Sequence, residues 1–163
     1  MSGTEPEGNG CKAFTSPLVI NEVDYDQPGV DKGDFLEIYN SSSDEVTLGG
    51  YAVILTNGAN GSAYEKFLLT QGGQALMPGQ YLVIGKPVLE ESVGSALFIP
   101  LGSNQGIQNG PDGISILRLA DEVIMDSIAY EGEMAMYGVG EGAHGGKDSS
   151  SKDGFLSRCS NGV

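Results

Sequence analysis

The stretch LVINEVDYDQPGVDKGDFLEIYNSSSDEVTLGGYAVI, from Leu18 to Ile54, covers most of three β-prone runs separated by turn residues, at residues 17–25, 34–40 and 51–56. In the second run Leu36 and Ile38 alternate with Glu37, a pattern typical of a strand with one buried face. The third run is apolar almost throughout, so we expect a central strand that is covered on both faces. This stretch therefore predicts neighbouring strands of a β-sheet.

The same pattern continues outward to about residue 130. The Asn57-Gly58 and Asn60-Gly61 pairs predict a hairpin into a strand near residues 64–69, and Pro78-Gly79 predicts a type II turn before a strand at 81–85. A brief strand is expected at 97–99, and a second hairpin at 114–119 and 123–130. We therefore predict an all-β fold, a single sandwich of about eight or nine mostly antiparallel strands. The predicted core consists of Leu18, Ile20, Leu36, Ile38, Val53, Leu55, Leu82, Ile84, Ile116, Leu117 and Ile128.

Three segments are expected along the chain. Residues 1–16 are polar and suit a flexible leader or an expression remnant, and residues 17–132 form the sandwich domain. Residues 133–163 begin as a Gly- and Ser-rich loop and end in a segment with the option of packing back on the domain. Cys11 and Cys159 lie near opposite ends of the chain. A bridge between them would contribute about 5 kcal/mol in the chain-entropy description, and the alternative is two free thiols in polar flanks.

Charge and residue usage exclude several classes of function. The 163 residues carry 22 Asp and Glu against 8 Lys and Arg, a formal net charge of -14, so we expect no nucleic-acid binding through a basic face. No apolar run approaches the roughly 18 to 20 residues that span a bilayer, so we predict no transmembrane segment. A single His and two Cys leave little from which to build a catalytic triad, a Cys-His pair or a zinc site. The composition therefore argues against an enzyme.

The sharpest local feature is the acidic loop after the first run, which carries Asp24, Asp26, Asp31 and Asp34. Ca²⁺ favours six to eight oxygen ligands from flexible loops, so these four carboxylates are the predicted metal ligands and Ca²⁺ the cofactor to test. The spacing is not that of an EF-hand. The alternative is that these are ordinary loop carboxylates, with Asp24 or Asp34 holding the turn by accepting hydrogen bonds from backbone amides.

A second acidic pair, Glu22 and Glu37, lies on strands that we expect to be adjacent. Two facing carboxylates raise the possibility of a glycosidase-like acid and base. A flat sheet face rarely supplies the enclosed pocket that raises the pKa of one carboxyl, which argues against that role.

Several motifs together resemble a known family. Glu22-Val23-Asp24, the F-x-x-x-x-N spacing from Phe35 to Asn40, S-x-D-E at residues 42–45 and L-G-G at 48–50 occur in this order. They resemble the opening of a lamin tail domain, although Tyr51 stands where family members usually have Trp. The segments 76–85, 107–117 and 126–132 are similar to the bacterial branch of that family.

The resemblance implies an immunoglobulin-like antiparallel sandwich with a binding or tethering role and no catalytic residues. It implies an extracellular or cell-surface setting in a larger bacterial protein, with a protein, a cell-surface or matrix component, or adjoining domains as partner. Lamin tails of animals associate with DNA, but the acidity of this chain departs from that character. The alternative function is a metal-dependent hydrolase that uses the acidic residues of the first loop.

Overall fold

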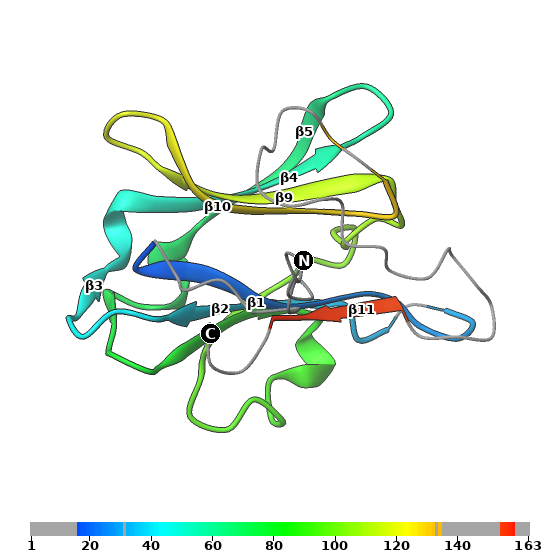
Figure 1. The fold of residues 1–163 in the computed structure, drawn as a ribbon. Helices are drawn as coiled ribbons and strands as arrows, with labels where there is room; N and C mark the ends of the chain where they lie inside the picture. The colour runs from blue at the N-terminus through cyan, green and yellow to red at the C-terminus, as the bar shows by residue number, and fades with distance from the viewer. Residues whose placement is uncertain (1–15, 31, 133, 135–153, 159–163) are drawn as a thin grey trace, which may run out of the picture.

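The computed structural model describes residues 16–30, 32–132, 134 and 154–158. Two β-sheets face each other, one of order β11-β1-β2-β7-β8 and the other of order β10-β9-β4-β5 (Figure 1). The strands are β1 (Leu18–Asp26), β2 (Phe35–Asn40), β3 (Val46–Thr47), β4 (Tyr51–Asn57), β5 (Ser62–Leu68), β6 (Ala75–Leu76), β7 (Tyr81–Gly85), β8 (Leu97–Pro100), β9 (Asp112–Arg118), β10 (Val123–Tyr130) and β11 (Gly154–Ser157).

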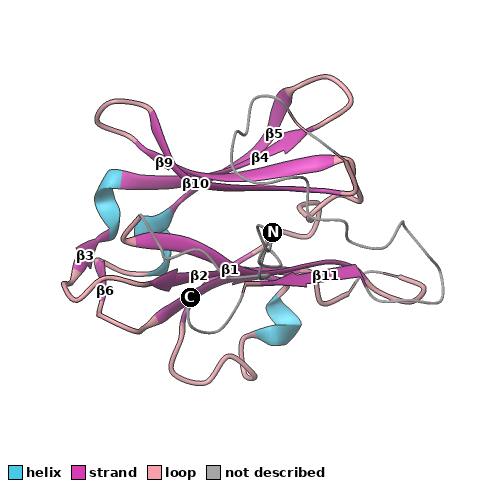
Figure 2. Ribbon diagram, viewed as in Figure 1, coloured by secondary structure: helices cyan, strands magenta, loops and turns pink. Residues whose placement is uncertain are grey.

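The prediction of an all-β, immunoglobulin-like sandwich is confirmed. Among the described residues the two facing sheets contain five and four strands, and β3 and β6 form a separate two-stranded ladder. Every pairing is antiparallel except that of β7 with β8. Short 3₁₀ turns at Leu48–Gly50, Leu69–Gly72 and Pro87–Leu89 are the helical pieces of the described chain (Figure 2). No helix in that part of the chain is long and apolar enough to cross a membrane.

The core lies between the two facing sheets and is built from the inward side chains of alternating positions. Of the predicted core, Leu18, Ile20, Leu36, Ile38, Val53, Leu55, Leu82, Ile84 and Ile116 are buried. The prediction was wrong for Leu117, which is only partly buried because it follows inward-facing Ile116 and points to the outer face of β9. Ile128 packs against the core but is partly exposed, because β10 lies at the edge of its sheet.

Turns follow the local chemistry that the sequence predicts. Gly79 has φ +73°, and the N–H of Gln80 donates to the carbonyl of Met77 at 3.0 Å, as the type II turn requires. The hairpin between β4 and β5 turns at residues 57–61, where Gly61 has φ +70°. Gly58 in the same turn is required for a different reason. A Cβ there would lie 2.0 Å from the carbonyl oxygen of Pro111, so only glycine allows this close approach.

A fully buried amide, Asn40, organises the end of β2. Its Nδ2 donates to the carbonyls of Asp44 at 2.9 Å and Leu76 at 2.8 Å, while its Oδ1 accepts from the N–H of Ser42 at 3.0 Å and from the Ser42 hydroxyl at 2.7 Å. These bonds join β2, the turn at residues 41–45 and the two-stranded ladder of β3 and β6. We call them the Asn40 network.

Candidate functional site

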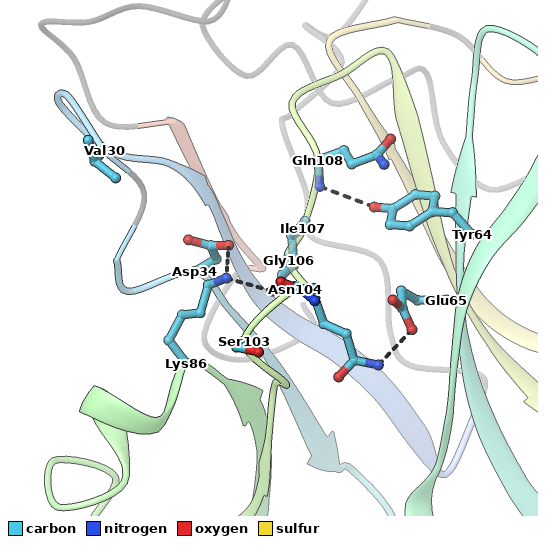
Figure 3. A pocket seen from close by; sticks show the side chains of 11 residues that line it. Val30, Asp34, Tyr64, Glu65, Lys86, Ser103, Asn104, Gly106, Ile107 and Gln108 are labelled. Carbon is cyan, nitrogen blue, oxygen red and sulfur yellow. Dashed lines mark hydrogen bonds and ion pairs between the residues drawn. The ribbon is translucent and has the colours of Figure 1, made fainter.

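The strongest candidate for a functional site is a polar pocket of about 500 Å³ at one end of the sandwich. It lies between the start of β2 and the end of β7 in one sheet and β5 in the other, and the loop between β8 and β9 lies across it (Figure 3). We call it the Asp34 pocket. Its lining residues are Val30, Asp34, Tyr64, Glu65, Lys86, Ser103, Asn104, Gln105, Gly106, Ile107 and Gln108.

Asp34 and Lys86 come together because β2 and β7 are paired. Phe35 lies opposite Gly85, and the N–H of Lys86 donates to the carbonyl of Asp34 at 3.0 Å. The Lys86 ammonium then lies 3.5 Å from Asp34 Oδ2 and donates to the carbonyl of Gln105 at 2.6 Å. Asp34 is only 2 % exposed, and its Oδ1 is buried without a hydrogen-bond partner. One oxygen of a buried carboxylate in this pocket thus lacks a donor, which is costly.

The loop across the pocket is held to both sheets. Gln105 Nε2 donates to Glu65 Oε2 at 2.8 Å, and Gln105 Oε1 accepts from the N–H of Gly102 at 2.7 Å. Gly106 passes directly over the ion pair, where a Cβ would lie 3.0 Å from Asp34 Oδ2 and 3.3 Å from Lys86 Nζ. The fold therefore presents a preformed polar pocket with the Asp34 and Lys86 pair on one wall and Glu65 on the other (Figure 3).

Three tyrosines, of which Tyr64 lines the pocket, form a cluster next to it. The Tyr64 hydroxyl accepts from the N–H of Gln108 at 3.1 Å, and the Tyr130 hydroxyl donates to the carbonyl of Gln108 at 2.7 Å. The rings of Tyr25 and Tyr130 lie 4.4 Å apart. Burial raises the pKa of Tyr64 and that of Tyr25 to about 12, and it raises the pKa of Tyr130 as well. All three phenols therefore stay protonated at neutral pH and can act as hydrogen-bond donors.

Asp112 belongs to the same cluster. Its Oδ1 accepts from the N–H of Gly58 at 3.0 Å, and its Oδ2 is buried without a hydrogen-bond partner. Burial raises the pKa of this carboxyl, although the hydrogen bond from the N–H of Gly58 acts in the opposite direction.

The four carboxylates predicted from the sequence to bind metal have separate surroundings. Asp24 Oδ2 accepts from Gln27 Nε2 at 3.2 Å, Asp26 is buried at the end of β1, and Asp34 lies beside Lys86. Asp31 lies outside the described residues. Within the described ranges, no group of three or more His, Cys, Asp or Glu side chains is placed to hold a metal ion. The Ca²⁺ site stays a prediction.

The acidic loop is held by a residue that sequence reasoning missed. Gln27 Oε1 accepts from the N–H groups of Lys32 at 3.1 Å and Gly33 at 2.9 Å. The sequence interpretation, as its alternative to a Ca²⁺ site, considered Asp24 or Asp34 for this task and did not consider Gln27. A glutamine reaches further than an aspartate, so it can span the turn and still donate to Asp24 from its other atom.

Glu22 and Glu37 lie directly opposite each other on β1 and β2. Asn21 Nδ2 donates to Glu37 Oε1 at 2.6 Å, and burial and then the charge of Glu37 raise the pKa of Glu22. The two side chains line a shallow depression of about 300 Å³ with Phe35 and Val83. The sequence predicted that the two carboxylates could face each other, and their register agrees with that prediction.

Sequence reasoning also missed Lys86, Gln105 and Glu65 as pocket residues. The available signal was the polar connection at residues 101–111, which is long for a loop between strands of a compact domain. Loops of that length are often functional.

Comparison with known proteins identifies the fold family. None of the curated proteins compared with the chain matches it. The family described as Lamin Tail Domain matches residues 12–132, which cover well over half of the chain and all strands from β1 to β10. The chain therefore belongs to the lamin tail domain family.

Proposed function

We propose that this domain is a non-catalytic binding module and that the Asp34 pocket recognises a basic, N–H-bearing segment of a partner protein. Lamin tail domains are immunoglobulin-like domains that generally serve as interaction modules. The observation that carries the proposal is a preformed polar pocket whose described lining includes two carboxylates, Asp34 and Glu65. Asp34 is nearly fully buried and its Oδ1 lacks a hydrogen-bond partner, so a cationic donor bound beside this carboxylate would offset its charge.

The charge of the chain supports a basic ligand. Among the described lining residues, two carry carboxylates, Asp34 and Glu65, and one carries a cation, Lys86, within a chain of formal net charge -14. Long-range attraction therefore favours cationic partners and disfavours polyanions. The other polar side chains of the lining are amides and hydroxyls, which can orient a ligand without adding charge, and Val30 and Ile107 add apolar surface.

We further infer that the domain tethers or presents a larger secreted or surface protein. The support is the resemblance of residues 76–85, 107–117 and 126–132 to the bacterial branch of the family. The alternative of a metal-dependent hydrolase would need several of the first-loop carboxylates to converge, and no observation in the described part of the chain favours it.

The test of the pocket is a titration of the ¹⁵N-labelled domain with N-acetyl-lysinamide, with N-acetyl-glutamate amide as the acidic control. We expect the lysine probe to shift the backbone amides of the loop at residues 103–108 and the amide of Lys86. Asp34→Asn should abolish these shifts, whereas Asp44→Asn, which removes an exposed carboxylate outside the pocket, should preserve them. Equal shifts with both probes, or in both variants, would refute the proposal.

A further inference from the structure

The strand β11 is a small addition to the edge of the five-stranded sheet. Among the described strands it pairs with β1 alone, with Ser157 opposite Glu22 and Leu156 opposite Val23. Leu156 is partly buried and packs against the core. Residues 133–153 connect this strand to the end of β10. The described contacts of the strand itself are thus one ladder and the apolar side chain of Leu156.

That residue, Arg158, ends the strand with a set of charged contacts. Its backbone N–H donates to the carbonyl of Asn21 at 2.7 Å, and its Nε donates to the carbonyl of Ile20 at 2.7 Å. Its Nη2 donates to Asp126 Oδ2 at 2.7 Å, and the same carboxylate oxygen accepts from the N–H of Ile20 at 2.7 Å. Both backbone polar groups of Ile20 are thus satisfied by one ion pair.

Two strand irregularities bring the ion pair together. The pairing of β1 with β2 shifts register between Ile20 and Glu22, and the pairing of β10 with β9 shifts between Ile124 and Asp126. Bulges of this kind bend a strand and redirect a side chain. Asp126 lies opposite Ile116, a core residue, so its side chain points inward from one sheet and reaches β1 of the other.

The geometry of the site suits a guanidinium group. Asp126 is 6 % exposed, and a buried carboxylate without a cation is strongly unfavourable. Arginine presents several N–H donors in a rigid planar fork, which here reach a carbonyl and a carboxylate at the same time. The ammonium group of lysine has no such fork. Glutamine would satisfy the carbonyl but not the charge.

We propose that the edge of β1 together with Asp126 is a docking site for an extended segment ending in arginine, and that residues 154–158 of a second copy of this chain can occupy it. The mode is β-strand addition, in which backbone hydrogen bonds supply affinity and side-chain anchors supply specificity. Exchange of an identical element between copies keeps every contact and is a low-cost route to a dimer.

The length of the connection allows this exchange. Residues 133–153 can span up to about 70 Å when extended, at roughly 3.3 to 3.6 Å per residue, which exceeds the dimensions of one domain. The chain's own segment has the advantage of a high effective concentration, so the exchanged form is expected where copies are concentrated or held side by side.

The docking site can be tested with a labelled peptide of residues 152–158, KDGFLSR, measured by fluorescence anisotropy. The receptor is the full chain carrying Arg158→Ala, whose own segment lacks the anchor, with reductant present because Cys11 and Cys159 are in the chain. We expect this variant to bind the peptide at least ten-fold more tightly than the wild-type chain does. A peptide ending in Ala, or a receptor that also carries Asp126→Asn, should lose at least ten-fold in affinity.

Exchange between copies is tested by mixing two full-length variants, Arg158→Ala with an intact Asp126 and Asp126→Asn with an intact Arg158. Each variant alone should stay monomeric by light scattering, and the mixture should form a heterodimer, since only the mixed pair contains one complete site. Arg158→Lys in place of wild-type Arg158 should weaken that heterodimer. Far-ultraviolet circular dichroism of each variant verifies the β fold.

Three results would overturn the proposal. Equal affinity of the peptides ending in arginine and in alanine would show that the Arg158 side chain does not contribute to binding. No peptide binding to a folded Arg158→Ala chain would show that the edge is not a docking site. A mixture that stays monomeric at the highest soluble concentration would restrict the segment to its own chain.

Discussion

Removal of the Asn40 side chain should cost the domain a large part of its stability. Asn40→Ala removes four hydrogen bonds, two donated by Nδ2 and two accepted by Oδ1, from a side chain that is fully buried. A typical intramolecular hydrogen bond contributes about 0.5 to 1.5 kcal/mol net, so four bonds give about 4 kcal/mol as a central figure. The Ser42 and Asp44 groups can turn to water, which lowers the expected loss to about 3 kcal/mol.

The sharper variant is Asn40→Asp, which keeps the size of the side chain and both accepted bonds. It replaces the two donors with a charged oxygen that faces the carbonyls of Asp44 and Leu76. Because a buried carboxylate beside two carbonyls is poorly solvated and repelled, Asn40→Asp should destabilise more than Asn40→Ala at neutral pH. The difference should shrink in acid, where the protonated carboxyl can again donate one bond.

The assay is urea unfolding followed by far-ultraviolet circular dichroism, since the chain has no Trp to report on folding. Ser43→Ala, in the exposed part of the same turn, is the matched control and should leave the midpoint nearly unchanged. If Asn40→Ala lowers the free energy of unfolding by less than about 1 kcal/mol, which is the contribution of a single hydrogen bond, the reasoning is refuted. An Asn40→Asp variant more stable than Asn40→Ala at neutral pH would also refute it.

Three further predictions concern ionisation and metal. Burial and the charge of Glu37 raise the pKa of Glu22, so its ionisation costs stability as the pH rises above 4.5. Glu22→Gln should raise the urea midpoint at neutral pH but not well below pH 4.5, whereas exposed Glu45→Gln should show no such pattern. An alkaline titration in the near ultraviolet should contain two phenols that ionise near pH 12, those of Tyr64 and Tyr25, and Tyr64→Phe should reduce that step to one phenol; a step of unchanged amplitude would contradict the assignment. The predicted Ca²⁺ site requires a higher melting temperature in Ca²⁺ than in chelator at matched ionic strength, lost in Asp26→Asn; equal midpoints would remove the site.

Local features of the sequence were sufficient to predict most strands. The runs at 81–85 and 123–130 have the bounds of β7 and β10, and the Pro78-Gly79 turn adopts the expected geometry. Alternation of apolar residues and turn chemistry act within a few residues, so they can be read without knowledge of the pairing. The same rule explains the error at Leu117, where two adjacent apolar residues were both assigned to the core although successive side chains point to opposite faces.

The site was less predictable because its contacts depend on pairing between distant strands. Asp34 was a candidate from its place in an acidic loop, but its partner Lys86 follows β7 and reaches it only through the register of β2 with β7. Asp126 and Arg158 meet through two register shifts, which leave no clear signal in a single sequence. Gln27 was overlooked because carboxylates were the residues expected to hold the acidic turn.

The antiparallel pairing of β1 with β11 has a mechanical consequence. The described chain enters β1 at Leu18, and Arg158 leaves β11 beside Asn21, so both segments emerge at the same end of this ladder. A pulling force applied across these two points would open the ladder from that end and load its hydrogen bonds one after another, not all at once. The ion pair of Arg158 with Asp126 lies at the point that is loaded first. Under tension, the strength of that single contact would decide whether β11 stays attached to the sandwich.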